Sequence, residues 1–163
     1  MNYRLSERAA SFVARKHGVV IDGVARPGGS GRAIPNINPS TGEVITEIIG
    51  ADARDVDAAV RAAQQAHDDG RWCKLPPAQK SRILLRLADL IEDHGDELAE
   101  LEMLEAGKLL AAALNGEVPF AAECYRYFAG WCTKLEGSTK NMTFAPAGEF
   151  HAYTVREPIG VVG

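Results

Sequence analysis

The feature that most constrains the fold is the apolar ending of the sequence, Pro158-Ile159-Gly160-Val161-Val162-Gly163. A continuous apolar run with β-branched residues is typical of a strand that is buried on both faces of a parallel sheet. Such a strand needs a crossover helix and neighbouring strands, and no residues for them follow. We therefore predict an α/β fold in which this run begins a sheet, and we expect the 163 residues to be an incomplete part of a longer chain.

The composition indicates a folded protein and argues against two classes of partner. Hydrophobic residues make up 46% of the sequence, which is enough to form a core. A formal net charge of -4 argues against a nucleic-acid partner and against a polybasic membrane anchor. The sequence contains no apolar run of the roughly 18 residues that a membrane span needs, and no signal-peptide pattern. We therefore expect a soluble, cytoplasmic protein without nucleic-acid or membrane partners.

Turn chemistry and hydrophobic periodicity predict β-hairpins followed by a helical layer. An Asp-Gly pair at 22–23 is a hairpin signal, and Asp52 is a favourable N-cap for a helix. Further along, Glu97, Glu100 and Glu102 are expected on a solvated helix face. The expected elements are a helix over 6–16, hairpins over 18–24 and 33–49, helices over 52–67, 76–94, 95–107 and 108–135, and strands over 141–144 and 150–156.

The glycine-rich segment 26–32, Arg-Pro-Gly-Gly-Ser-Gly-Arg, raises the alternative of a nucleotide-binding loop. A loop of that kind follows a buried strand and precedes a helix. Here a second strand-like segment follows instead. We therefore interpret the segment as a turn between strands.

Aromatic side chains gather between 120 and 131, where they could stack on a cofactor or pack in a core. We favour the core, because aromatic side chains bury so much area. The members are Phe120, Tyr125, Tyr127, Phe128 and Trp131.

The cysteines Cys73, Cys124 and Cys132 could be nucleophiles or metal ligands. They form no Cys-x-x-Cys pair, and the four histidines show no zinc-binding spacing. We favour the interpretation that the cysteines are small buried hydrophobic residues.

Seven short segments of the sequence share their order and spacing with one enzyme family. They are 38–43 (NPSTGE), 55–60 (DVDAAV), Trp72, 86–92 (RLADLIE), 101–108 (LEMLEAGK), 127–131 (YFAGW) and 156–163 (REPIGVVG). Together they resemble the aldehyde dehydrogenase superfamily over nearly the whole chain. The segments 12–18 and 104–108 are most similar to its phenylacetaldehyde dehydrogenase-like members.

The resemblance implies an enzyme that oxidises an aldehyde to a carboxylic acid with NAD or NADP. In such enzymes a cysteine nucleophile and a glutamate-activated water act beside an oxyanion hole. The resemblance places all of these residues, and those that bind the cofactor, beyond Gly163. We therefore assign no catalytic or cofactor-binding residue here, and we expect the 163 residues alone to be inactive. The choice of aldehyde, and of NAD or NADP, stays open.

The resemblance also implies a division of the chain into three parts. Residues 1–140 would form the N-terminal hairpins and the helices of a dinucleotide-binding domain. Residues 141–157 would form an arm that adds its edge to a neighbouring subunit and so makes a homo-oligomer. Residues 158–163 would start the first strand of a Rossmann-like sheet.

A monovalent cation site is a further implication of the resemblance. The backbone carbonyl of Ile37 and the carboxylate of Glu105 would be its ligands, and hard oxygen donors suit such ions. Aspartate is frequent in the family where this chain has Glu105, so a solvated carboxylate at a helix end is the alternative.

Two other classes of protein are compatible with these patterns. The first is a non-catalytic interaction module that keeps the helices and the arm and joins full-length subunits. The second is an unrelated α/β binding domain, which would require the ordered segments to be a coincidence.

Overall fold

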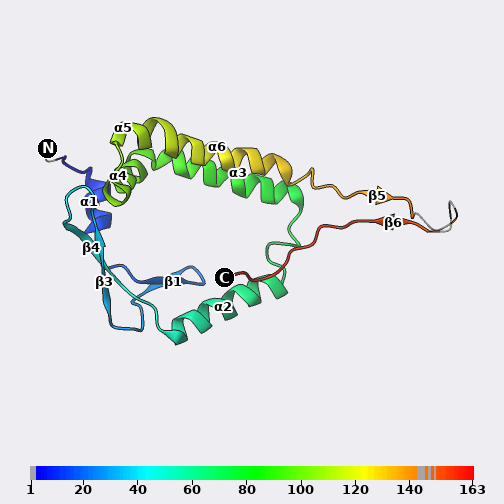
Figure 1. Ribbon diagram of the computed structural model, residues 1–163, viewed down its shortest axis with the longest axis horizontal. Helices are drawn as coiled ribbons and strands as arrows, with labels where there is room; N and C mark the ends of the chain where they lie inside the picture. Colours follow the sequence, from blue (N-terminus) through cyan, green and yellow to red (C-terminus); the bar gives the residue numbers. More distant parts are fainter. Residues whose placement is uncertain (1–2, 143–145, 147, 149) are drawn as a thin grey trace.

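The computed structural model describes residues 3–142, 146, 148 and 150–163, and it combines helices with short antiparallel strands (Figure 1). Two hairpins and one short helix come first, then the long helices, and finally a two-stranded arm that projects from the rest. The elements are α1 (Glu7–Val13), β1 (Val19–Ile21), β2 (Val24–Arg26), β3 (Ala33–Ile37), β4 (Val44–Ile49), α2 (Ala53–Asp68), α3 (Pro77–Asp93), α4 (Gly95–Ala106), α5 (Leu110–Ala112), the π-helix η1 (Ala113–Glu117), α6 (Val118–Trp131), β5 (Thr139–Lys140) and β6 (Ala152–Tyr153).

The strands of the described residues form three separate two-stranded antiparallel ladders, β1–β2, β3–β4 and β5–β6. The predicted turn at 22–23 is confirmed, because Asp22 and Gly23 have φ values of 51° and 75°. A two-residue turn with positive φ at both central positions matches the right-handed twist of the strands it joins. Both predicted N-terminal hairpins are therefore present.

Local signals also place the helix boundaries. The Asp52 side chain accepts hydrogen bonds from the backbone N–H groups of Arg54 and Asp55, and the Asp55 carboxylate accepts one from Asp52 in return. This reciprocal capping satisfies N–H groups that have no partner within helix α2. Gly107 ends α4 with a φ of 67°, a left-handed conformation that glycine adopts at little cost.

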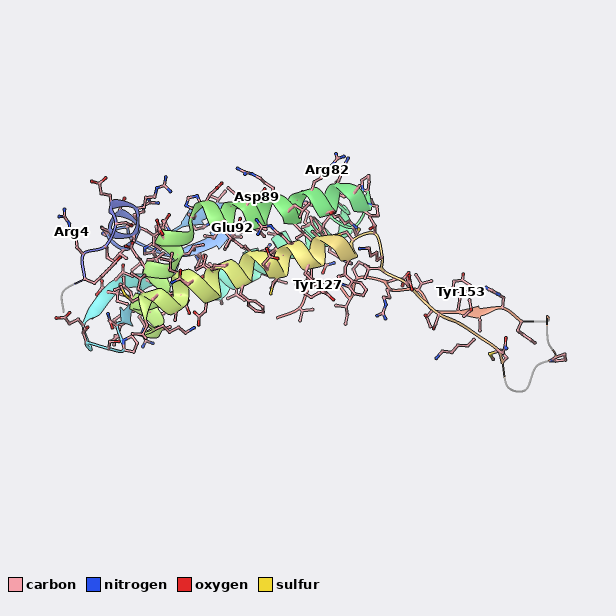
Figure 2. The ribbon with its side chains drawn as sticks, turned by 90° about the horizontal axis from the view of Figure 1, so that it is seen from above. Arg4, Arg82, Asp89, Glu92, Tyr127 and Tyr153 are labelled. Atoms are coloured by element: carbon pink, nitrogen blue, oxygen red, sulfur yellow. The ribbon has the colours of Figure 1, made fainter. Side chains whose placement is uncertain are left out.

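Helices α3 and α6 lie side by side and form the main helical contact (Figure 1). Ala88, Ala122 and Ala129 are buried there, and their small side chains let the two backbones approach closely. Arg126 on α6 donates to Glu92 at 2.7 Å and to Asp89 at 3.3 Å on α3. Figure 2 shows Asp89 and Glu92 on α3, close to α6. Hydrogen bonds to these carboxylates, to Glu92 above all, raise the pKa of Arg126.

The helical region predicted over 108–135 is one region interrupted by the π-helix η1, which immediately precedes α6. Pro119 explains the position of this wider turn. Proline has no N–H to donate to the carbonyl four residues earlier, so the regular α-helical ladder cannot pass through it.

The arm and the tail differ in part from the predicted strands. The strand expected over 141–144 falls partly on residues 143 and 144, which lie outside the described residues, and β5 occupies Thr139–Lys140 instead. The strand expected over 150–156 is confined to Ala152–Tyr153. The described residues 158–163 form no strand, because a strand needs a ladder partner and no other described segment pairs with them. The sheet that they would begin stays a prediction.

The predicted burial of the aromatic cluster is wrong for this chain. Phe120 is 70% exposed, Tyr127 62% and Phe128 59%, because α3 covers only one face of α6. Tyr127 points away from α3 in Figure 2. The cysteines are not buried either, since Cys73 is exposed and the other two are half-buried.

Candidate functional site

The two residues predicted to bind a cation lie at one junction between strand β3 and helix α4. Ile37 is the last residue of β3, and Glu105 lies in the last turn of α4. The side-chain amide of Asn36 donates to Glu105 Oε1 at 2.5 Å and so joins the two elements. A Cβ atom built on Gly107 would lie 2.9 Å from Ser40 Oγ, which places the following turn against the helix end as well. Residues 69 positions apart are thus brought together.

The backbone at this junction is irregular. The register of β3 against β4 shifts between Asn36 and Ile37, as at a β-bulge. A bulge disrupts the regular ladder and changes the direction of nearby backbone groups. The predicted ligands, the Glu105 carboxylate and the Ile37 carbonyl, are hard oxygen groups, and such groups suit a monovalent cation better than a soft metal ion. Within the described ranges no group of three or more His, Cys, Asp or Glu side chains could hold a metal ion.

Lys108, next to this junction, forms two ion pairs. Its Nζ lies 2.8 Å from Glu102 Oε1 and 2.7 Å from Glu117 Oε1, so it joins the end of α4 to η1. Hydrogen bonds to Glu102 and then to Glu117 raise the pKa of Lys108. A lysine held in its charged form cannot serve as a general base, so its contacts indicate a structural role.

The glycine-rich segment 26–32 is a turn that packs against the chain itself. A Cβ atom on Gly28 would lie 2.1 Å from the carbonyl oxygen of Gly50, so this backbone approaches β4 too closely for any side chain. The N–H of Gly29 donates to Asp55 Oδ2 at 2.6 Å. Hydrogen bonds from Gly29 and then Asp52 lower the pKa of Asp55, which keeps it negative. A phosphate would meet that carboxylate, so the loop does not fit a dinucleotide cofactor.

Sequence reasoning missed Glu100, which it placed on a solvated face. Glu100 is only 5% exposed, and it anchors the N-terminal segment to α4. It accepts hydrogen bonds from Tyr3 Oη at 2.8 Å, from Ser6 Oγ at 2.6 Å and from the Ser6 N–H at 3.1 Å. No local pattern could reveal this contact, because 94 residues separate Ser6 from Glu100.

The β5–β6 arm carries the surface predicted to join subunits. Within the described part of the chain its ladder has two strands, so each strand has one edge without a ladder partner. Apolar side chains on it are exposed, among them Phe150 at 66% and Tyr153 at 65%. Figure 2 shows Tyr153 on this projecting arm.

The helices were also compared with the length and hydropathy of a membrane span. Among the described residues, no helix is long and apolar enough to cross a membrane.

Comparison with known proteins gives consistent results over the whole chain. The sequence profile of the aldehyde dehydrogenase family matches residues 26–163. The chain is 42% identical over 163 residues to DhaS of Bacillus subtilis, covering all of this chain and 32% of that protein. It is 43% identical over 148 residues to phenylacetaldehyde dehydrogenase of Pseudomonas fluorescens, covering 90% of this chain and 30% of that protein.

A solved structure shows the same fold. The NAD+ complex of an aldehyde dehydrogenase from Bacillus cereus superposes with a TM-score of 0.87 at 34% identity, over 98% of this chain and 32% of that chain. The chain therefore spans about a third of the length of the relatives that it matches. The family match, the shared fold and the ordered segments of the sequence agree, and the chain belongs to the aldehyde dehydrogenase family.

Proposed function

We propose that this chain is the N-terminal portion of an enzyme that oxidises an aldehyde to a carboxylic acid with NAD or NADP. The observation that carries the proposal is the family match over residues 26–163, together with the shared fold of an NAD+ complex. The similarity to phenylacetaldehyde dehydrogenase supports an aryl-substituted aldehyde as the first substrate to try.

The proposal includes inactivity of the 163 residues alone. The described residues offer no dinucleotide loop, and the thiol of Cys132, for example, donates to the Phe128 carbonyl of its own helix at 3.8 Å. The test compares the purified chain with the product of a reading frame extended beyond residue 163, following NADH absorbance with phenylacetaldehyde and NAD+. We expect activity from the extended protein only. Aldehyde-dependent NADH formation by the 163-residue chain would contradict the proposal.

The second part of the proposal is that the arm, residues 141–157, assembles the protein into a homo-oligomer. Open strand edges and exposed apolar side chains are the features through which strands add to another sheet. The double variant Tyr153→Asp and Val155→Asp should have the mass of a monomer in light scattering, while the wild type is larger. Val56→Asp on α2 is the control, since Val56 is also exposed and lies outside the arm. An unchanged mass of the arm variant would refute this assignment.

The alternative function is a non-catalytic module that joins full-length subunits. The exposed arm and the exposed aromatic side chains of α6 favour it, because both are surfaces on which another chain could pack. Co-purification of a tagged 163-residue chain with the extended protein, together with a stable short product in cells, would support the module. A reading frame that continues through residue 163 would favour the enzyme.

The third part concerns a monovalent cation held by the Ile37 carbonyl and the Glu105 carboxylate. A ligand that binds only the folded state stabilises it, and the stabilisation grows with the logarithm of the ligand concentration once this exceeds the dissociation constant. We expect NaCl or KCl to raise the Tm of the wild type above that in N-methylglucamine chloride of equal ionic strength. Glu105→Gln should remove the difference, and Glu47→Gln, on the exposed side of β4, should keep it. A wild type that melts equally in all three salts would exclude the site.

A further inference from the structure

A pocket of about 480 Å³ lies between the end of α1, the β1–β2 hairpin and the end of β4. We call it the α1 pocket. Its lining is mainly apolar, and small-molecule sites of this size are typically apolar with a few polar groups that orient the ligand. The apolar lining residues are Phe12, Val19, Val20, Ala25, Pro27 and Ile49.

The backbone around the α1 pocket is held by long-range contacts. The N–H of Ile49 donates to the carbonyl oxygen of His17 at 2.9 Å and so ties β4 to the segment after α1. His17 Nε2 lies 3.0 Å from the carbonyl oxygen of Phe12, and because a carbonyl only accepts, this nitrogen is the donor. A Cβ atom on Gly18 would lie 2.3 Å from the carbonyl oxygen of Arg26, so the hairpin is in close backbone contact there too. The pocket is therefore formed before any ligand binds.

Three cationic side chains line this apolar pocket, namely Arg15, Lys16 and Arg26. The Arg15 guanidinium lies 5.9 Å from the centre of the Phe12 ring. In the part of the chain that the structure describes, none of the three forms an ion pair with a carboxylate within 4.0 Å. The neighbouring Asp55 carboxylate already accepts hydrogen bonds from backbone N–H groups. The pocket thus combines an apolar surface with positive charge that no carboxylate among the described residues neutralises by direct contact.

We propose that the α1 pocket binds a small organic anion, a carboxylate with an aryl or alkyl body. The body would lie against Phe12 and Val20, and the carboxylate would face Arg15, Lys16 and Arg26. Charge complementarity selects the carboxylate end, and burial of the apolar body supplies the remaining affinity. The proposal concerns a surface that plays no part in the proposed aldehyde oxidation, so either can fail without the other.

The test is calorimetric titration of the 163-residue chain with phenylbutyrate. Phenylbutyramide has the same body without the charge, and acetate has the charge without the body. We expect phenylbutyrate to bind at least about fivefold more tightly than either, and more weakly as salt rises toward about 0.5 M, since screening weakens exposed charge pairs. Equal affinity for phenylbutyramide would overturn the proposal, and so would equal affinity for acetate.

Variants locate the binding to this pocket. The triple variant Arg15→Gln, Lys16→Gln and Arg26→Gln should bind phenylbutyrate about tenfold more weakly. Arg82→Gln, on the exposed side of α3, should bind it as the wild type does. Val20→Glu is an independent test, because Val20 is 71% exposed and tolerates a polar side chain, yet the new carboxylate would repel the ligand. Unchanged affinity in both pocket variants, with circular dichroism like that of the wild type, would refute the assignment.

Discussion

Replacing Glu100 by Gln is expected to detach the N-terminal segment from helix α4. The two carboxylate oxygens accept hydrogen bonds from the Tyr3 hydroxyl and from both the hydroxyl and the N–H of Ser6. Glutamine keeps the length of the side chain but replaces one acceptor oxygen with a donor. One or two of these donors would then face an NH2 group in a site that is only 5% exposed.

The size of the effect follows from the bonds that are lost. A hydrogen bond to a charged group contributes about 1.5 to 3 kcal/mol, and a buried donor without a partner costs about as much. Since glutamine retains one acceptor, we expect the free energy of unfolding to fall by about 2 kcal/mol at pH 7. That is a large fraction of the stability of an ordinary domain, which is about 5 to 15 kcal/mol.

The effect of Glu100→Gln should depend on pH with a defined sign. Burial raises the pKa of Glu100, but hydrogen bonds from Ser6 and Tyr3 outweigh it, and the pKa lies below its usual value. Between the folded and the unfolded pKa, the unfolded chain therefore binds more protons, and stability rises with pH. The contribution of Glu100 is present above the unfolded value of about 4.3 and is lost as the pH falls through the lower folded value. The difference between wild type and variant should shrink over this range.

The assay is urea unfolding followed by circular dichroism from pH 7 down to pH 3, with amide exchange of residues 3–13 as the local measurement. Glu97→Gln, one turn earlier on α4, is the matched control, because among the described residues its side chain pairs with the exposed His94 alone. We expect the control to change stability by less than about 0.5 kcal/mol. A Glu100 variant as stable as the control at pH 7, or one whose N-terminal amides exchange no faster, would refute the reasoning.

Three further substitutions test the helices. Asp52→Ala should lower the free energy of unfolding by about 1 kcal/mol, because two backbone N–H groups at the start of α2 lose their acceptor. Thermal melting followed by the helix signal in circular dichroism measures this loss. Gly107→Ala should lower the free energy of unfolding by about 1 kcal/mol, since the φ of Gly107 is 67° and the new Cβ would lie 2.9 Å from Ser40 Oγ. Gly116→Ala is its control and should lower the free energy of unfolding less, because a Cβ atom there has no neighbour within 4 Å. Arg126→Gln should lower the Tm in dilute buffer and less so in about 1 M NaCl, because its partners are exposed carboxylates; a salt-independent loss would mean that packing dominates.

Local chemistry made much of the secondary structure predictable. The Asp-Gly turn at 22–23, the N-cap Asp52 and the left-handed Gly107 each act within a few residues, and the structure has the elements that they predict. The π-helix before α6 is harder to predict from the sequence, because a proline in a helical pattern predicts an irregularity but not its form. The family was recognisable for a similar reason, since its segments lie in order along the chain.

Burial was predicted least well, because it depends on what lies opposite each side chain. Phe120 has the character of a core residue and yet is 70% exposed, since none of the described elements covers it. Glu100 has the character of a surface residue and yet is buried, since Tyr3 and Ser6 supply the donors that compensate its charge. Periodicity states which residues share a face of a helix but not what packs on it.

The family can be predicted from local sequence, whereas the candidate sites depend on the tertiary structure. Spacing along the chain was enough to predict an aldehyde dehydrogenase, because turns, caps and helix periods are local properties that each segment carries with it. The junction of Asn36 with Glu105 and the cationic α1 pocket exist only after folding, because their members come from elements far apart in the sequence. Bringing such residues together depends on tertiary contacts, which no short stretch of sequence contains.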